Sequence, residues 1–154
     1  MEEQYFNIRF QVDQSASEVF DAVTNVRAWW SEALEGDSVQ LGDEFSYRHG
    51  TVHYSKHKLI DVIPNQKVVW LTLESSLTFV EKQDEWNRTT IVFEITTNEN
   101  KTFLTVSHLG LVPSLQCFNG CSKGWTYYLQ NSLLPLITSG KGNPDKISDH
   151  NSLL

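Results

Sequence analysis

The sequence has 154 residues, of which 12 are Lys or Arg and 19 are Asp or Glu, so its formal net charge is −7. Its length predicts one domain with a hydrophobic core, and its composition is that of an ordinary globular protein. The negative charge, with no basic run, argues against binding of nucleic acid or anionic lipid. No apolar run reaches the roughly 20 residues that span a bilayer, so no membrane insertion is expected.

The first residues and the cysteines bear on location. The chain begins Met-Glu-Glu-Gln, without the basic and apolar stretches of a secretory signal peptide. Its two cysteines provide no disulfide framework of the kind that secreted domains use. We therefore expect a cytoplasmic protein.

The first part of the chain predicts one strand and then two short helices. Residues 5–12 alternate between apolar and polar side chains, which is typical of a half-buried strand. Ser15 or Ser17 can cap the helix that follows, and apolar side chains recur at helical spacing as far as Trp30. Asn25 interrupts this pattern, so we expect two short helices, followed by a loop over residues 31–42.

Five further strands are predicted over residues 44–49, 51–63, 67–73, 89–97 and 102–109. The segment 67–73 is almost continuously apolar, which predicts a strand that is covered on both faces or lies at the centre of a sheet. Pro64 and Asn65 mark one turn, and residues 98–100 mark a hairpin. Residues 77–80 either extend the strand before them or form another one.

Residues 114–140 form the long helical pattern of the chain. Gly140 supplies a stop signal, and Pro135 lies inside the helix, where it removes the hydrogen bond to the Asn131 carbonyl and should kink the helix. The apolar stripe that faces the core consists of Phe118, Cys121, Trp125, Tyr128, Leu129, Leu133, Leu136 and Ile137.

These elements predict an α+β fold in which a curved antiparallel sheet of about six strands wraps around the long C-terminal helix. Residues 1–144 are expected to form this single domain, and residues 145–154 a flexible C-terminal tail. A lone long helix must bury its stripe against the sheet, and the space between the two is where a cavity would form.

The order of elements, together with particular residues, resembles the helix-grip fold of the START-like (SRPBCC) superfamily. More narrowly it resembles the Aha-like family, relatives of the C-terminal domain of the activator of the heat-shock chaperone ATPase. The resemblance runs from about Phe6 to Pro144. It rests on the segments 19–23, 29–30, 42–47, 62–64, 69–70, 105–111, 124–125, 132–133 and 138–142.

The resemblance implies a fold more than a function, because helix-grip domains include lipid-transfer proteins, cyclases, hormone receptors and co-chaperones. Such domains commonly have a cavity, so the resemblance favours aromatic side chains that line a pocket. The alternative is that the same rings simply fill the core. The candidate wall residues are Trp29, Trp30, Phe45, Tyr47, Trp70, Phe79, Trp86, His108, Phe118, Trp125 and Tyr128.

The histidines do not have the spacing of a metal site. His53 and His57 share a face of an extended chain but lie two pleats, about 13 Å, apart. Without carboxylates in a suitable pattern, we expect no metal ion and no cofactor. His108 is predicted to face inward near the start of the long helix, where it either orients a polar ligand group or is a hydrogen-bonded structural residue.

The remaining reactive side chains carry no catalytic signature. Cys117 and Cys121 are interpreted as small buried thiols, and Glu81, Asp84 and Glu85 as a solvated acidic loop. No nucleophile–base arrangement, phosphate loop or paired carboxylate stands out, so no catalysis is assigned.

Three functions follow, in order of preference. The first is binding of a small hydrophobic molecule between the long helix and the sheet. The second is a co-chaperone-like or stress-response role, exerted through contact with a chaperone. The third is a cyclase-like enzyme that uses the same cavity, with His108 as acid or base. We expect a monomer or a weak dimer.

Overall fold

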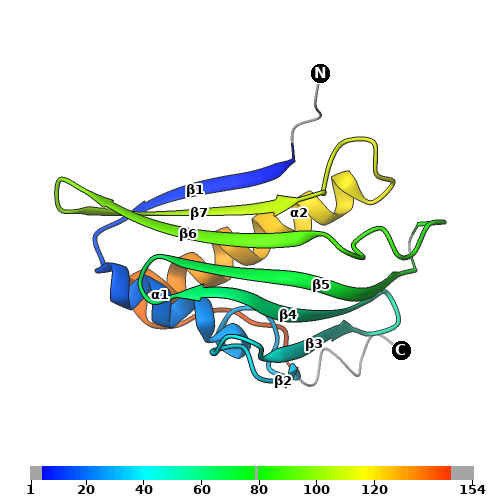
Figure 1. Cartoon of the computed structure of the whole chain (residues 1–154), viewed down its shortest axis with the longest axis horizontal. Coiled ribbons are helices and arrows are strands. Elements are labelled where there is room, and N and C mark those ends of the chain that lie inside the picture. The colour runs from blue at the N-terminus through cyan, green and yellow to red at the C-terminus, as the bar shows by residue number, and fades with distance from the viewer. Residues whose placement is uncertain (1–4, 79, 147–154) are drawn as a thin grey trace.

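The computed structural model describes residues 5–78 and 80–146, which form a seven-stranded antiparallel sheet with a long helix across one face (Figure 1). The strand order is β1-β7-β6-β5-β4-β3-β2. The strands are β1 (Phe6–Val12), β2 (Glu35–Gly36), β3 (Glu44–His49), β4 (His53–Ile63), β5 (Lys67–Leu77), β6 (Thr90–Asn98) and β7 (Lys101–Leu109). The helices are α1 (Ala16–Thr24), the 3-10 turn η1 (Val26–Ala28), α2 (Phe118–Tyr128), the π-helical turn η2 (Leu129–Leu133) and α3 (Leu134–Ser139).

The α+β helix-grip architecture predicted from the sequence is confirmed, with seven strands in place of about six. The additional strand is β2, a two-residue edge strand inside the segment that was predicted to be a loop. The two short helices after the first strand are α1 and η1. Ser15 caps α1 through a reciprocal pair of hydrogen bonds with Glu18, which explains why the helix begins where it does.

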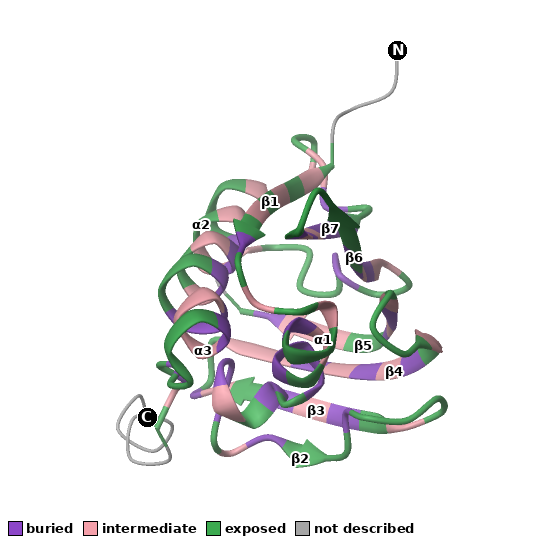
Figure 2. Cartoon of the chain, turned by 90° about the vertical axis from the view of Figure 1, so that its left-hand side faces the viewer, coloured by how far each residue is buried: buried purple, intermediate pink, exposed green. Residues whose placement is uncertain are grey.

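The sheet and the long helix enclose one hydrophobic core. Figure 2 shows the helix on one side and the sheet on the other, with buried residues facing the space between them. Alternation along β6 and β7 directs Ile91, Phe93, Leu104 and Val106 into this core, each at most 1% exposed. No helix among the described residues is long and apolar enough to cross a membrane.

The long helix is irregular next to Pro135. Because Pro135 has no N–H, the Asn131 carbonyl lacks its helical partner, and a π-helical turn precedes the proline. The Asn143 side chain donates a hydrogen bond of 2.6 Å to that carbonyl. The helix ends at Gly140, which adopts φ = 83° as a left-handed cap. The chain after the helix is therefore tied back onto it.

Candidate functional site

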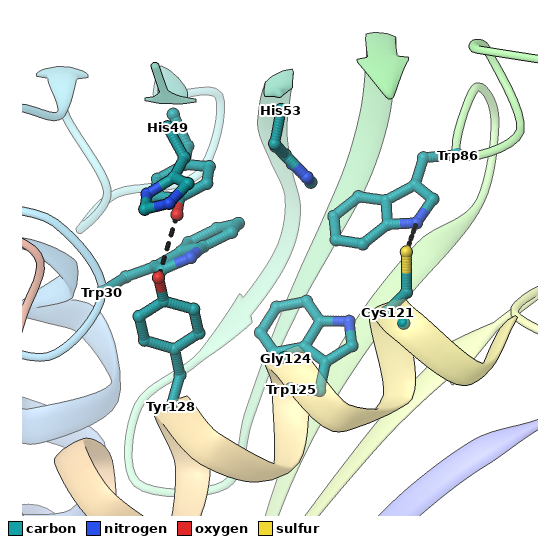
Figure 3. A pocket seen from close by; sticks show the side chains of 10 residues that line it. Trp30, His49, His53, Trp86, Cys121, Gly124, Trp125 and Tyr128 are labelled. Atoms are coloured by element: carbon teal, nitrogen blue, oxygen red, sulfur yellow. Dashed lines mark hydrogen bonds between the residues drawn. The ribbon is translucent and has the colours of Figure 1, made fainter. Parts of the chain in front are cut away.

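A cavity of about 200 Å³ lies between α2 and strands β3 and β4 (Figure 3). In this view the labelled rings from the helix, the strands and two connecting segments surround a common space. The lining residues are Trp30, Tyr47, His49, His53, Trp86, Gly120, Cys121, Gly124, Trp125 and Tyr128. Helix and sheet thus leave a gap where their aromatic side chains meet.

Three tryptophans form the walls of the cavity. The rings of Trp86 and Trp125 are parallel, 5.8 Å apart between centroids with an interplanar angle of 5°. Trp30 stacks on Tyr47 at 4.2 Å and lies 5.2 Å from Trp125. Because each ring packs against another ring, the walls are held in place without a ligand.

Trp86 is positioned by the residue before it. Both carboxylate oxygens of Glu85 accept hydrogen bonds of 2.9 Å from the backbone N–H groups of Gln116 and Cys117, just before α2 begins. These groups have no partner within the helix, so the carboxylate caps it. The indole N–H of Trp86 then donates to Cys121 Sγ at 3.3 Å. The prediction of a solvated acidic loop is wrong for Glu85, which is 9% exposed.

His108 lies behind the cavity wall and is 1% exposed. Its Nδ1 accepts a hydrogen bond of 3.0 Å from the indole N–H of Trp125, so its proton is on Nε2, which donates to Thr89 Oγ1 at 2.8 Å. Thr89 in turn donates to the Trp86 carbonyl at 2.6 Å. Burial, with a smaller effect of His53, lowers the pKa of His108 to about 3. His108 therefore joins the two wall tryptophans and leaves no ring nitrogen for a ligand.

One end of the cavity is polar. The carboxylate of Asp145 accepts hydrogen bonds from the hydroxyls of Tyr47 and Tyr128, both at 2.8 Å, and from His49 Nδ1 at 3.0 Å. The two hydroxyl oxygens are 3.1 Å apart. Burial, together with the Asp145 carboxylate, raises the pKa of both tyrosines above the usual value, so both hydroxyls keep their protons at neutral pH.

Asp145 reaches this position because the chain after α3 passes tightly over the first helices. A Cβ on Gly142 would lie 2.3 Å from the Ala28 carbonyl oxygen, so only glycine fits there. The Asp145 backbone then donates to the Trp30 carbonyl and accepts from Glu32, both at 2.9 Å. The folded part therefore continues through residue 146, whereas the sequence had placed the start of a tail at 145. Residues 147–154 lie outside the described residues.

A buried chain of hydrogen bonds reaches the cavity from β4 and β5. Ser55 Oγ lies 3.0 Å from His53 Nε2 and 2.8 Å from His57 Nε2. His57 Nδ1 lies 3.1 Å from Thr72 Oγ1. Burial is the main cause that lowers the pKa of His53 to about 3 and that of His57 well below its usual value. Both histidines are therefore neutral at neutral pH.

The described part of the chain has no cluster of three or more His, Cys, Asp or Glu side chains that could hold a metal ion. Cys117 and Cys121 are both buried free thiols, four residues apart at the start of α2. A hydrogen bond with Cys121 and burial raise the pKa of the Cys117 thiol, which disfavours the reactive thiolate.

The structure brings together half of the predicted wall residues that it describes. Those that line the cavity are Trp30, Tyr47, Trp86, Trp125 and Tyr128. Those that lie away from it are Trp29, Phe45, Trp70, Phe118 and His108. Trp29 and Trp70 stack on each other and on Trp30, and Phe45 packs edge-on against Trp70. These three rings fill the core behind Trp30, as the alternative interpretation had it. Phe79 lies outside the described residues.

Some lining residues were missed. Gly120, Cys121 and Gly124 share the helical face of Trp125 and Tyr128, so helical spacing could have found them. His49 follows Tyr47 by two along β3, so strand alternation could have found it as well. His53 was considered only as a metal ligand. Nothing in the local sequence of Asp145 indicates its place at the polar end.

Comparisons with known proteins agree with this fold. The family model described as Activator of Hsp90 ATPase homolog 1-like protein matches residues 13–136. The solution structure of the Aha1 dimer from Colwellia psychrerythraea has 23% identity and a TM-score of 0.71, over 90% of this chain and 99% of that chain. No curated protein matches the sequence.

Two further solved structures are similar. The crystal structure of DynU16, from the dynemicin biosynthetic locus, has 18% identity and a TM-score of 0.66 over 92% of this chain. The match covers 49% of DynU16, so this chain spans about half its length. The crystal structure of CalU16 from Micromonospora echinospora has 18% identity and a TM-score of 0.61, over 86% of this chain and 74% of that chain. Identities this low support the shared fold alone.

Proposed function

The chain belongs to the family of Activator of Hsp90 ATPase homolog 1-like proteins, and we propose that it uses the helix-grip fold of that family to bind a small, largely apolar aromatic molecule. The observation that carries this proposal is the cavity between α2 and the sheet, with walls made of Trp30, Trp86 and Trp125. Concave sites with aromatic walls and a few polar groups are typical of small-molecule binding.

The size of the cavity limits the ligand. An apolar cavity of about 150 Å³ takes up benzene, and this one measures about 200 Å³. Pockets for drug-sized molecules run from about 300 to 1,000 Å³. We therefore favour a ligand of one or two fused rings over a fatty acid or a steroid.

The polar end supports a ligand that also has a hydrogen-bond donor. The hydroxyls of Tyr47 and Tyr128 give their hydrogens to Asp145, so their oxygens keep lone pairs that can accept from a ligand. Gly120 and Gly124 support the proposal in another way, because side chains at these positions of α2 would take up space in the cavity.

The test is an NMR titration with one- and two-ring aromatic probes such as indole and naphthalene. The indole N–H signals of Trp30, Trp86 and Trp125 are expected to shift, while those of Trp29 and Trp70 in the core shift less. Steroid and fatty-acid probes are expected to bind more weakly. If no aromatic probe moves the three wall signals, or if all five tryptophans respond alike, the proposal is wrong.

A second candidate is contact with a chaperone. It is favoured by the description of the matching family and by the similarity to the Aha1 dimer structure. Its test is whether the purified chain stimulates the ATPase of a purified Hsp90-type chaperone, and no stimulation would count against it. The dimer is a property of that relative, so the monomer or weak dimer and the cytoplasmic location stay predictions for this chain.

The cyclase-like alternative has less support. It depended on His108 as acid or base, and both ring nitrogens of His108 are engaged, with Trp125 and Thr89. A general acid or base must come within hydrogen-bond reach of the substrate. His108 does not line the cavity.

A further inference from the structure

Ser55 lies between two histidines in a buried series of hydrogen bonds that ends at the cavity. The hydrogen bonds run from Thr72 on β5 through His57 and Ser55 to His53 on β4, with neighbouring polar atoms 2.8–3.1 Å apart. Thr72, His57 and Ser55 are fully buried, and only His53 lines the cavity. These hydrogen bonds therefore connect three buried side chains of β4 and β5 to the wall of the cavity.

The direction of these hydrogen bonds follows from counting hydrogens. A neutral histidine has one N–H and one acceptor nitrogen, and a hydroxyl has one hydrogen to donate. If Thr72 donates to His57 Nδ1, the proton of His57 is on Nε2 and is donated to Ser55. Ser55 then donates to His53 Nε2. The remaining hydrogen of His53 must therefore be on Nδ1.

The opposite direction leaves a buried hydrogen unused. If His57 Nδ1 donated to Thr72, the Thr72 hydroxyl would need another acceptor, and the described residues offer it none within hydrogen-bond distance. An unpaired buried donor carries a penalty equivalent to a factor of roughly 5 to 150 in population. When Thr72 is the first donor, the polar hydrogens of Thr72, His57 and Ser55 all have acceptors, so this direction is favoured.

The ring of His53 lines the cavity, and its Nδ1 atom is the ring nitrogen that the hydrogen-bonded series leaves free. Among the described residues this atom has no hydrogen-bond partner. It is not one of the fully buried polar atoms that lack a partner, so part of its surface is accessible. The His53 ring lies edge-on to Trp86 at 4.7 Å and to Tyr47 at 5.1 Å, and Figure 3 shows it beside the space enclosed by the wall rings. A hydrogen on Nδ1 can therefore be donated to a molecule that occupies the cavity.

We infer that Thr72, His57 and Ser55 hold His53 in the tautomer that donates its Nδ1–H into the cavity, and that the ligand is an aromatic molecule with a hydrogen-bond acceptor. A carbonyl oxygen or a ring nitrogen without hydrogen fits this description. The ligand class rests on the proposed function, whereas the tautomer of His53 does not. Since His53 is neutral, it selects for an acceptor atom rather than for an anionic group.

The tautomer is tested without any ligand. Long-range ¹H–¹⁵N NMR spectra of the wild-type protein at neutral pH are expected to show His53 protonated on Nδ1 and His57 on Nε2. Ser55→Ala removes the contact between the two rings, so His53 is expected to mix both tautomers in that variant. A wild-type spectrum with His53 protonated on Nε2 would overturn the inference.

The ligand class is tested with quinoline and naphthalene, two-ring probes of similar size that differ in one acceptor nitrogen. In wild type, the ratio of quinoline to naphthalene affinity is expected to be about 2- to 10-fold higher than in His53→Phe, the range that one neutral hydrogen bond supplies. An unchanged ratio would refute the acceptor. If neither probe binds wild type, the proposed function and the ligand class both fall, and the spectra still decide the tautomer.

Discussion

Gly124 offers a direct way to fill the cavity. It lies in α2, lines the cavity, and a Cβ at this position would meet no atom within 4 Å. A leucine here therefore enters empty space. Glycine inside a helix costs about 0.5–1 kcal/mol relative to alanine, and leucine is nearly as good a helix former. We expect Gly124→Leu to raise the free energy of unfolding by at least that amount.

The same substitution should abolish ligand binding. A cavity of about 200 Å³ has little room for a leucine side chain and a two-ring probe together. At about 2–4 °C per kcal/mol for a chain of this size, the helix contribution alone predicts a melting temperature about 1–4 °C higher. Thermal unfolding by circular dichroism and NMR titration with naphthalene measure the two effects on one sample.

Gly124→Ala is the matched control. It has the same gain in helix propensity but adds only a methyl group, so it should be more stable than wild type and still bind the probe. The reasoning is refuted if Gly124→Leu binds naphthalene as tightly as wild type. It is also refuted if Gly124→Leu is less stable than wild type by more than about 1 kcal/mol, the sign of an overpacked site.

Three other predictions concern the supports of the cavity. Glu85→Gln leaves a buried backbone N–H before α2 poorly paired, so we expect a loss of about 2 kcal/mol, or about 4–8 °C in melting temperature. Wild type should lose stability as the pH falls below about 6.5, because the pKa of His108 is about 3 when folded and near 6.5 when unfolded, so the unfolded chain binds more protons. His108 contributes up to about 1.4 kcal/mol per pH unit to this loss. The free energy of unfolding of His108→Gln, measured by urea unfolding, should therefore depend less steeply on pH. Gly142→Ala forces the backbone apart, so we expect a loss of about 1–3 kcal/mol and NMR shifts at the tyrosines that contact Asp145.

Each of these variants has a control or an outcome that contradicts it. Asp84→Asn changes the exposed neighbour of Glu85 and should stay within about 0.5 kcal/mol of wild type. A Glu85→Gln variant as stable as this control would show that the cap contributes little. Equal pH profiles for wild type and His108→Gln would contradict the neutral buried histidine. Lys141→Ala, at an exposed position, should leave the tyrosine signals unchanged. Unchanged signals in Gly142→Ala would show that the close approach of residue 142 to the Ala28 carbonyl is unimportant.

Much of the fold could be predicted because its signals are local. Alternation along residues 5–12 and the helical stripe after residue 114 depend only on the period of the backbone, so strands, helices and their apolar faces were recognised. The two-residue strand β2 was missed because its pairing with β3 has no periodicity of its own. The Pro135 irregularity was anticipated from the missing N–H. The partner of the freed carbonyl, Asn143, was not, since it comes from beyond the helix.

The candidate site could be predicted only in part, for a related reason. Sequence periodicity shows that Trp125 and Trp70 are both buried, but it does not show which of them faces a gap. That depends on how far the helix stands from the sheet at each point, and this distance is set by the packing of all the rings together. In the structure Trp125 lines the cavity, while Trp70 is sealed behind Trp30.

The class of fold, the inward faces of the strands and helices and the aromatic interior could all be predicted, because they follow from the spacing of side chains along the backbone. Three features depend on how the helix and the sheet pack: the cavity itself, the contact of Asp145 with the tyrosines at its polar end, and the hydrogen bonds that tie His53 in its wall to Ser55. The first two join residues from distant segments. Their relative positions arise when the helix packs on the sheet, and no local pattern encodes them.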